Sequence, residues 1–359
     1  MGGAGGAGTD LMSVSIIAGT ASDAVLAKLG PIDSKQVFQP SHHSKPEEIV
    51  ARLRSIAQSG EVAHLIIQCE PDRPLMAYAF LFTDELADVS RLVSAGFAID
   101  AGVLLDCLLD RKLTSLSPSL IAEQMEFASD VFLDGADVAV AQSIAKTLNP
   151  CARVSSVINA ATWLDGRSTA LDFDEAINGA GWRKLLDGED SSSNENVTAF
   201  GYHARRPFHP ERFSNLLQKG LRGVFRAKGF FWLATRMEEV GGLNLAGSEL
   251  QCMSAGHWWA ARDVQTRESE MPERTRKEWQ EPFGDRRQSF AVMALSVSRD
   301  ALERQFDSCL LSDDEMNGGE EAWRNFPDPF PSWAAHAHQH HHDHECDHDH
   351  GSHDHDCCG

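Results

Sequence analysis

Basic residues are scarce in this sequence. Its 359 residues contain 32 Lys and Arg against 53 Asp and Glu, which gives a formal net charge of −21. Residues 336–359 hold six acids and no base, and without those six acids the chain still carries −15. Nucleic acids and anionic membranes bind clustered Lys and Arg, so the composition argues against both as main partners. An acidic surface also keeps proteins soluble, and this plainer interpretation stands beside the first.

Long apolar runs are missing too. No window approaches the ~18–20 apolar residues that a membrane span needs. The start MGGAGGAGTDLM has neither the basic nor the apolar region of a secretory signal. Five of the eight Cys stand in apolar segments without paired spacing, and we expect buried thiols at Cys69, Cys107, Cys151, Cys252 and Cys309. We therefore expect a cytoplasmic protein with reduced thiols and no membrane partner.

The first half of the chain alternates short apolar runs with helical patterns. Gly-rich residues 1–10 are expected to be disordered. From residue 11 to 160 the pattern predicts an α/β domain with a mainly parallel sheet. Its expected strands are 13–18, 64–67, 97–101, 131–133 and 152–157, and its expected helices are 21–29, 46–58 and 139–148.

The second half has a different pattern. Residues 161–196 are polar and end in DGEDSSSNEN, which predicts a linker. Residues 197–333 predict a smaller α+β domain in which helices at 210–219 and from Ser298 cover one face of a sheet. Its expected strands are 199–205, 222–235, around 250–261 and 287–297. Residues 334–359 form a His-rich tail that we expect to be disordered.

The second domain resembles the C-terminal domain of the CobW family. The resemblance rests on phrases in the family's order: RRPFHPERF, GVFRAKGFFWLATR, GHWWAA, GDRRQSFAVMAL and FPDPFPSW, between residues 205 and 333. CobW proteins are P-loop GTPases of the SIMIBI class, and several handle zinc or cobalt. The first domain resembles the family's G domain more loosely, through HLIIQCEPDRPL, LVSAGFAIDA and IAEQMEFASDVFLDGAD.

The nucleotide motifs that the resemblance implies are missing. A P-loop needs Gly-x-x-x-x-Gly-Lys-Ser/Thr so that backbone N–H groups, a Lys and a hydroxyl hold the phosphates and Mg²⁺. After the first strand this chain has GTASDAVLAKLG, in which Gly19 remains, Asp23 would repel phosphate, and Lys28 comes too late. No Gly-Lys-Ser/Thr follows Gly19.

The other family motifs are incomplete as well. The guanine motif Asn-Lys-x-Asp corresponds to residues 134–137, where only Asp137 matches. At the Walker B region, Pro71 has no N–H to offer a phosphate, and the Cys-x-Cys-Cys metal motif has no counterpart. We expect a degenerate G domain, assign no catalytic residue, and keep Asp137 as a remnant of a nucleotide site. The sequence argues against GTP and Mg²⁺ as cofactors and leans against an enzyme.

The tail HAHQHHHDHECDHDHGSHDHDCCG is rich in soft metal ligands. Imidazole and thiolate bind Zn²⁺, Co²⁺ and Ni²⁺, and Asp can bond the second imidazole nitrogen. A purification tag would be an uninterrupted His run, whereas here His alternates with Asp and Cys. The tail therefore predicts transition-metal binding, zinc above all. Its ligands are His336, His338, His340, His341, His342, His344, Cys346, His348, His350, His353, His355, Cys357 and Cys358.

A group of basic residues stands out in the second domain. Arg205, Arg206, Arg226 and Lys228 lie close in sequence within an acidic chain. They fit a solvated strand edge or ion pairs at a domain interface. They also fit a docking patch for an acidic partner or for the first domain.

Three functions follow from these patterns. The leading hypothesis is a CobW-like metal-binding protein, a chaperone or buffer, that has lost GTP hydrolysis and docks a protein client. The alternatives are an active GTPase that delivers metal, and a regulatory paralogue that pairs with an intact CobW-like GTPase.

Overall fold

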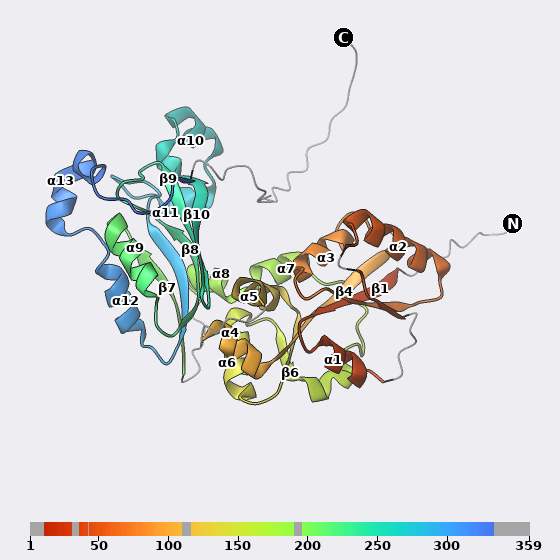
Figure 1. Cartoon of the computed structure of the whole chain (residues 1–359). Coiled ribbons are helices and arrows are strands. Elements are labelled where there is room, and N and C mark those ends of the chain that lie inside the picture. The colour runs from red at the N-terminus through yellow and green to blue at the C-terminus, as the bar shows by residue number, and fades with distance from the viewer. Residues whose placement is uncertain (1–10, 31–35, 42, 110–115, 190–195, 334–359) are drawn as a thin grey trace, which may run out of the picture.

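The computed structural model describes residues 11–30, 36–41, 43–109, 116–189 and 196–333. Within them the chain forms two β-sheets, one parallel and one antiparallel, each with helices packed on it (Figure 1). This confirms the expected fold class, an α/β domain followed by a smaller α+β domain. The segments expected to be disordered, 1–10 and 334–359, lie outside the described residues.

The first sheet is parallel throughout, and its strands in the described chain follow the order β2-β3-β1-β4-β5-β6. They span Met12–Ala18 (β1), Val37–Phe38 (β2), His64–Gln68 (β3), Ser90–Asp100 (β4), Asp130–Asp134 (β5) and Arg153–Ser156 (β6). The strand expected at 97–101 is wrong at both ends. It starts earlier, and it stops at Asp100 because this carboxylate accepts a hydrogen bond from the Val103 N–H (3.0 Å) and so caps the next helix.

Helices lie on both faces of this sheet. They are α1 (Ser22–Lys28), α2 (Pro46–Ser59), α3 (Leu75–Ala79), α4 (Ala101–Leu108), α5 (Pro118–Phe127) and α6 (Val138–Leu148), with short 3₁₀ turns η2 (Phe80–Phe82) and η3 (Val157–Thr162). Side chains of β1 alternate between the two faces: Val14 and Ile16 enter one core, and Ile17 enters the other with Val25 and Trp163. The predicted helix 46–58 begins at Pro46 as expected and ends one residue later, at Ser59 before Gly60.

The region expected to be a linker contains helices. Residues Phe173–Asn178 form α7 and Gly181–Leu186 form α8. The start of α8 lies so close to α6 that a Cβ on Gly181 would be 2.0 Å from the carbonyl oxygen of Thr147. Leu185 is buried in the core, although the segment as a whole is polar. At least residues 173–186 therefore belong to the folded body; the domain boundaries remain a prediction.

The second sheet is antiparallel, with the order β10-β9-β8-β11-β7 among the described residues. Its strands are Val197–Ala204 (β7), Val224–Phe231 (β8), Glu239–Ala246 (β9), Glu249–His257 (β10) and Gln288–Leu295 (β11). Helices α9 (Pro210–Lys219) and α12 (Arg299–Asp307) cover one face around Phe208, Phe213, Phe290 and Phe306 (Figure 1). The remaining elements are η4 (Trp259–Ala261), α10 (Val264–Glu270), α11 (Glu273–Glu278) and α13 (Asp313–Trp323).

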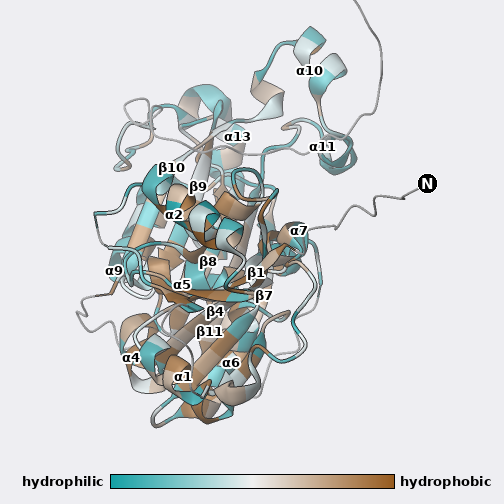
Figure 2. Cartoon of the chain, turned by 90° about the vertical axis from the view of Figure 1, so that its right-hand side faces the viewer, coloured by the Kyte–Doolittle hydropathy of each residue, from teal (hydrophilic) through white to brown (hydrophobic). Residues whose placement is uncertain are grey.

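The other face of the second sheet meets the first domain. Phe225, Ala291 and Met293 belong to the same buried cluster as side chains of β1, α4 and α6. Apolar residues are concentrated in the strands and in the helices between the sheets, whereas the outlying α11 is largely hydrophilic (Figure 2). The two sheets thus share one core.

The structure can be compared with two predictions made from composition, on membrane spans and on buried cysteines. In the described part of the chain no helix is long and apolar enough to cross a membrane. Cys69, Cys107 and Cys309 are buried, as predicted, and burial raises the pKa of Cys309 to about 11. The prediction is wrong for Cys151, which is exposed because it lies in the turn after α6, and Cys252 is half-buried.

Candidate functional site

The carboxyl ends of the parallel strands form the edge at which open α/β sheets bind ligands. Here β1 ends at Ala18, β3 at Gln68, β4 at Asp100 and β5 at Asp134. The nucleotide motifs implied by the family resemblance fall at this edge.

The connection from β1 to α1 consists of Gly19, Thr20 and Ala21. Gly19 has φ +101°, and a Cβ there would lie 2.1 Å from the carbonyl oxygen of Ala98. The Ala21 N–H donates to the same oxygen at 3.0 Å. The turn is therefore held against β4, and it is much shorter than the eight-residue P-loop motif.

Side chains occupy the space beside this turn. The Gln68 amide donates to Asp23 Oδ1 (2.7 Å) and Ser22 Oγ (2.9 Å), and its oxygen accepts from Gln39. Asp23 is thus tied to the end of β3. Lys28 lies in the last turn of α1, away from the turn after β1. These contacts link β3 and α1 directly.

A buried carboxylate follows β3. Glu70 is 5% exposed, accepts a hydrogen bond from the Tyr78 hydroxyl through Oε2, and lies 3.7 Å from Arg73 Nε. Its other oxygen, Oε1, is buried without a hydrogen-bond partner among the described groups. Burial and the hydrogen bond to Glu70 raise the pKa of Tyr78. The structure therefore places Glu70 just after β3 as a buried hydrogen-bond acceptor.

Asp137 lies at the start of α6 and is exposed. It has a left-handed backbone (φ 60°), and its side chain makes no capping hydrogen bond. The preceding Gly135 sits against Asp100, since a Cβ there would be 2.1 Å from Asp100 Oδ2. The structure therefore brings the remnant guanine motif next to the β4 edge, and a nucleotide contact at Asp137 stays a prediction.

The predicted metal ligands cannot be placed relative to this edge of the sheet. His336, His338, His340, His341, His342, His344, Cys346, His348, His350, His353, His355, Cys357 and Cys358 all lie outside the described residues. Among the residues that the structure describes, no three His, Cys, Asp or Glu side chains gather into a metal site.

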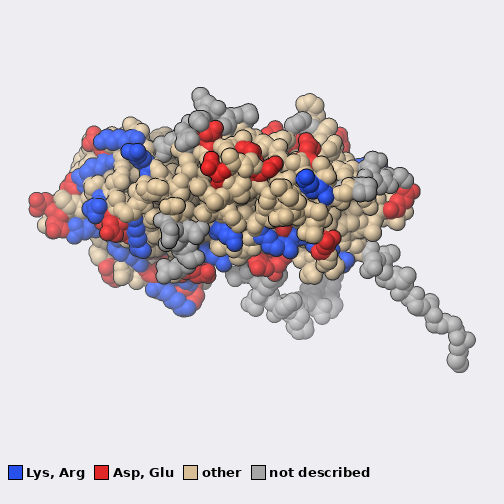
Figure 3. Space-filling view, turned by 90° about the horizontal axis from the view of Figure 1, so that it is seen from below, with Lys and Arg blue, Asp and Glu red and all other residues tan. Residues whose placement is uncertain are grey.

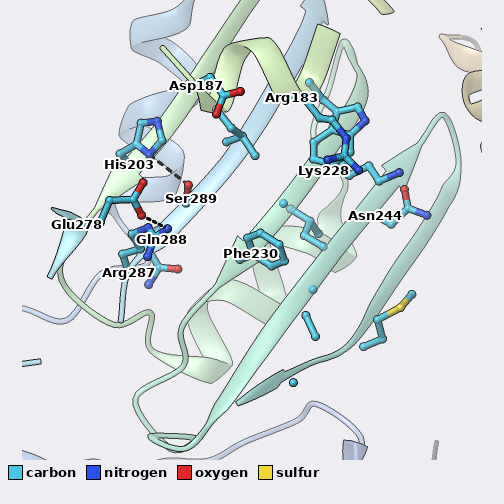
Figure 4. Close-up of a pocket in the computed structure, with 18 of the residues that line it drawn as sticks. Arg183, Asp187, His203, Lys228, Phe230, Asn244, Glu278, Arg287, Gln288 and Ser289 are labelled. Carbon is cyan, nitrogen blue, oxygen red and sulfur yellow. Dashed lines mark hydrogen bonds and ion pairs between the residues drawn. The ribbon is translucent and has the colours of Figure 1, made fainter. Parts of the chain in front are cut away.

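A large cavity lies on the second sheet, on the side away from α9 and α12. Its volume is about 1360 Å³, and it is lined by β8, β9 and β10, by α8, and by the ends of β7, β11 and α11 (Figure 4). Sequence reasoning did not find it. The available signal was the alternation of polar with small apolar residues at 203–205 (His-Ala-Arg) and 226–228 (Arg-Ala-Lys).

The structure shows different partners for the four basic residues that stood out in the sequence of this domain. Arg226 is fully buried, and Glu126 of α5 accepts hydrogen bonds from its Nε (2.6 Å) and Nη2 (3.1 Å), which confirms an ion pair at the domain interface. Arg206 pairs with Asp313 on the surface (2.6 Å). Lys228 lines the cavity beside Glu126 (3.9 Å), and Arg205 lines its far end.

Two cavity groups have perturbed acidities. Burial lowers the pKa of His203, and the nearby Arg287 lowers it further. Burial also lowers the pKa of Lys228, against the opposing effect of Glu126. His203 Nδ1 lies 3.3 Å from Ser289 Oγ (Figure 4). Both groups belong to a partly desolvated, positively charged environment.

Charges elsewhere on the molecule are mixed. Figure 3 shows Lys and Arg interspersed with Asp and Glu on the face seen from below, around a largely uncharged middle. Acidic and basic side chains are therefore mixed on this face.

Known proteins share both sequence and domains with this chain. The family described as "Cobalamin synthesis protein cobW C-terminal domain" matches residues 197–310. A zinc-regulated GTPase metalloprotein activator of Dictyostelium discoideum is 29% identical over 79% of this chain and 67% of that protein. Since residues 197–359 are less than half of the chain, that similarity extends into the first domain.

A zinc chaperone of Mycobacterium tuberculosis is 36% identical over 140 residues, 38% of this chain and 35% of that protein. Among solved structures, the Zn(II)-bound YjiA GTPase of E. coli aligns with 84% of this chain and 99% of its own, at 12% identity and a TM-score of 0.33. That structural likeness is too low to carry an argument about the site. The family match identifies residues 197–310 as a CobW C-terminal domain, and the sequence similarity to the Dictyostelium protein covers most of the chain.

Proposed function

We propose that this protein handles zinc, as a chaperone or buffer, through its C-terminal His/Asp/Cys tail, and that it does so in the cytoplasm without hydrolysing GTP. Support for zinc comes from relatives named as a zinc chaperone and a zinc-regulated GTPase activator. The tail supplies ten His and three Cys within residues 336–359. Those are the ligand types that zinc prefers.

The observation that carries the loss of GTP hydrolysis is the turn after β1. Phosphoryl transfer depends on a backbone cradle, a Lys and Mg²⁺ that neutralise the developing charge. This chain has the short turn Gly19–Ala21 held against β4, with Asp23 beside it and no Gly-Lys-Ser/Thr in the sequence. An acid in that place would repel the phosphates.

Metal binding in the tail has a defined pH dependence. Imidazole binds metal in its neutral form, so protons compete with zinc below the ordinary His pKa near 6.5. We expect zinc affinity to fall steadily between about pH 7 and pH 5. The many overlapping ligand sets favour graded affinities over one selective site, so Co²⁺ and Ni²⁺ should bind as well.

The decisive test is a zinc titration by calorimetry of the full chain against a chain that ends at residue 335. We expect the truncated protein to lose the high-affinity sites and to keep its circular dichroism spectrum. A truncated protein that keeps all of them would place the metal site in the folded body. Co²⁺ and Ni²⁺ titrations of both proteins would rank the metals.

Nucleotide binding needs a separate test. We expect no tight Mg²⁺-dependent binding of GTP by calorimetry and no turnover above the buffer blank. Tight binding would instead favour the alternative of an active metal-delivering GTPase. Stoichiometric co-purification with an intact CobW-like GTPase would favour the regulatory paralogue.

A further inference from the structure

The floor of the cavity is a row of residues that crosses the second sheet. Strand register aligns His203 with Ser289, Ser289 with Phe230, Phe230 with Gly242, and Gly242 with Met253. All five line the cavity. The first domain covers the neighbouring part of the same face at Phe225 and Met293. The cavity is therefore the part of this sheet face that the first domain leaves open.

This floor exposes apolar side chains to solvent. Phe230 is 41% exposed and Met253 is 36% exposed, both unusually high for large apolar residues in strands of the described chain. Gly242 lies between them in the row and leaves a depression. Its φ is not in the left-handed region, and a Cβ there would meet its nearest atoms at an ordinary 3.4 Å. The backbone does not require this glycine, and glycine inside a strand often marks close approach by another chain.

The rim of the cavity is basic in an acidic protein. Five Lys or Arg and three Asp or Glu are among the described residues that line it, whereas the chain as a whole carries −21. Arg183 and Lys228 lie over the Trp182 ring, with 4.7 and 4.8 Å to its centroid. The carboxylate nearest to Lys228, Glu126, is shared with the buried Arg226.

The opposite end of the cavity also has surplus positive charge. Arg205 donates to the backbone carbonyls of Glu278 (2.6 Å) and Gly284 (3.3 Å), which are neutral partners. Arg287 pairs with the Glu278 carboxylate, which lies 3.5 Å from Arg274 as well (Figure 4). Arg274 also pairs with Asp187 (2.5 Å), so this end has three guanidinium groups, Arg205, Arg274 and Arg287, against the two carboxylates of Asp187 and Glu278.

We propose that this cavity docks an acidic peptide segment of a partner protein, extended across the strands, with an apolar side chain in the depression at Gly242. A volume of 1360 Å³ exceeds the roughly 300–1,000 Å³ of small-molecule pockets, which favours a peptide. The two basic ends receive carboxylates, and Phe230 and Met253 contact the apolar side chain. This docking does not depend on metal binding by the tail.

The test uses the full chain and a displayed library of random 12-residue peptides. Recovered peptides are synthesised, and their affinity is measured by fluorescence anisotropy for three variants. Arg183→Glu reverses a charge at the rim, and Gly242→Leu fills the depression. Arg304→Glu is the matched control, because Arg304 is exposed on α12, across the sheet from the cavity.

We expect the recovered peptides to be acidic with at least one large apolar residue. Arg183→Glu and Gly242→Leu should each weaken binding at least tenfold, and Arg304→Glu less than threefold. Thermal melts check that each variant is folded. If Gly242→Leu does not fold, the affinity of Arg183→Glu still decides the test.

Several results would overturn the proposal. The first is recovery of no peptide, and the second is recovery of peptides without acidic residues. The third is a peptide affinity that neither Arg183→Glu nor Gly242→Leu changes. Self-association of the chain that Gly242→Leu abolishes would assign the cavity to a second copy. Binding that appears only after removal of residues 334–359 would assign it to the chain's own tail.

Discussion

The buried pair of Arg226 and Glu126 should be the strongest polar link between the two domains. The Arg226 side chain is 1% exposed and that of Glu126 is 7% exposed, and two hydrogen bonds join them. Removing one partner of a buried pair leaves an uncompensated charge and typically costs about 3–5 kcal/mol. The cost of Arg226→Met should be about 3 kcal/mol, because Glu126 still has the Lys228 ammonium 3.9 Å away as a partner. Glu126→Met should cost about 5 kcal/mol, near the upper figure, because it leaves both Arg226 and Lys228 without their carboxylate.

The double variant separates this pair from ordinary packing. Replacing a buried pair by apolar groups is often close to neutral, so Arg226→Met with Glu126→Met should stay within about 2 kcal/mol of the parent. Equilibrium urea unfolding followed by tryptophan fluorescence measures all four proteins, and the shared core predicts one transition. Arg206→Met is the control: its pair with Asp313 is exposed and should contribute less than about 1 kcal/mol. Single costs that add within about 0.5 kcal/mol in the double variant would refute the reasoning.

Three further predictions concern single positions. Arg212 lowers the pKa of Glu315 to about 2, so this carboxylate should stabilise the fold above its unfolded pKa near 4.3 and lose that effect as the pH falls towards 2. Glu315→Gln should therefore cost about 1–2 kcal/mol of unfolding free energy at neutral pH. The urea midpoints of the parent and the variant should converge in acid. Gly19→Ala should cost at least about 2 kcal/mol by thermal melting, since its φ of +101° and the carbonyl of β4 both oppose a Cβ, and an unchanged midpoint would contradict the described turn. Iodoacetamide should label Cys151 in the native protein and Cys69 only after unfolding, which peptide mapping checks; equal rates would show that the burial of Cys69 is wrong.

Apolar periodicity predicted the elements that pack on both sides of a regular core. The helix at 46–58 was found because its buried residues recur at helical spacing, and the strand at 64–67 was found because its apolar residues form a continuous run. Elements without that spacing were missed. Strand β2 has only two residues, β9 has Gly241 and Gly242 where apolar residues would be expected, and α7 buries none of its side chains.

The site was less predictable than the fold. The missing P-loop could be read from sequence because its chemistry needs residues in one continuous stretch. The cavity could not, since its floor depends on the register between strands far apart in the chain, such as β7 and β11. The partner of Arg226 could not be predicted either, because it depends on tertiary contact. Arg226 pairs with Glu126 and is not solvated because α5 packs against the second sheet.

The shared core has a practical consequence for anyone who would isolate the CobW C-terminal domain. The family match begins at residue 197, yet Phe225, Ala291 and Met293 are buried against side chains from the first half of the chain. Excision at that boundary would expose this apolar face together with the guanidinium of Arg226, and a fragment of residues 197–333 should aggregate or need detergent. The segment matched by the family model is therefore shorter than the segment that shares one core.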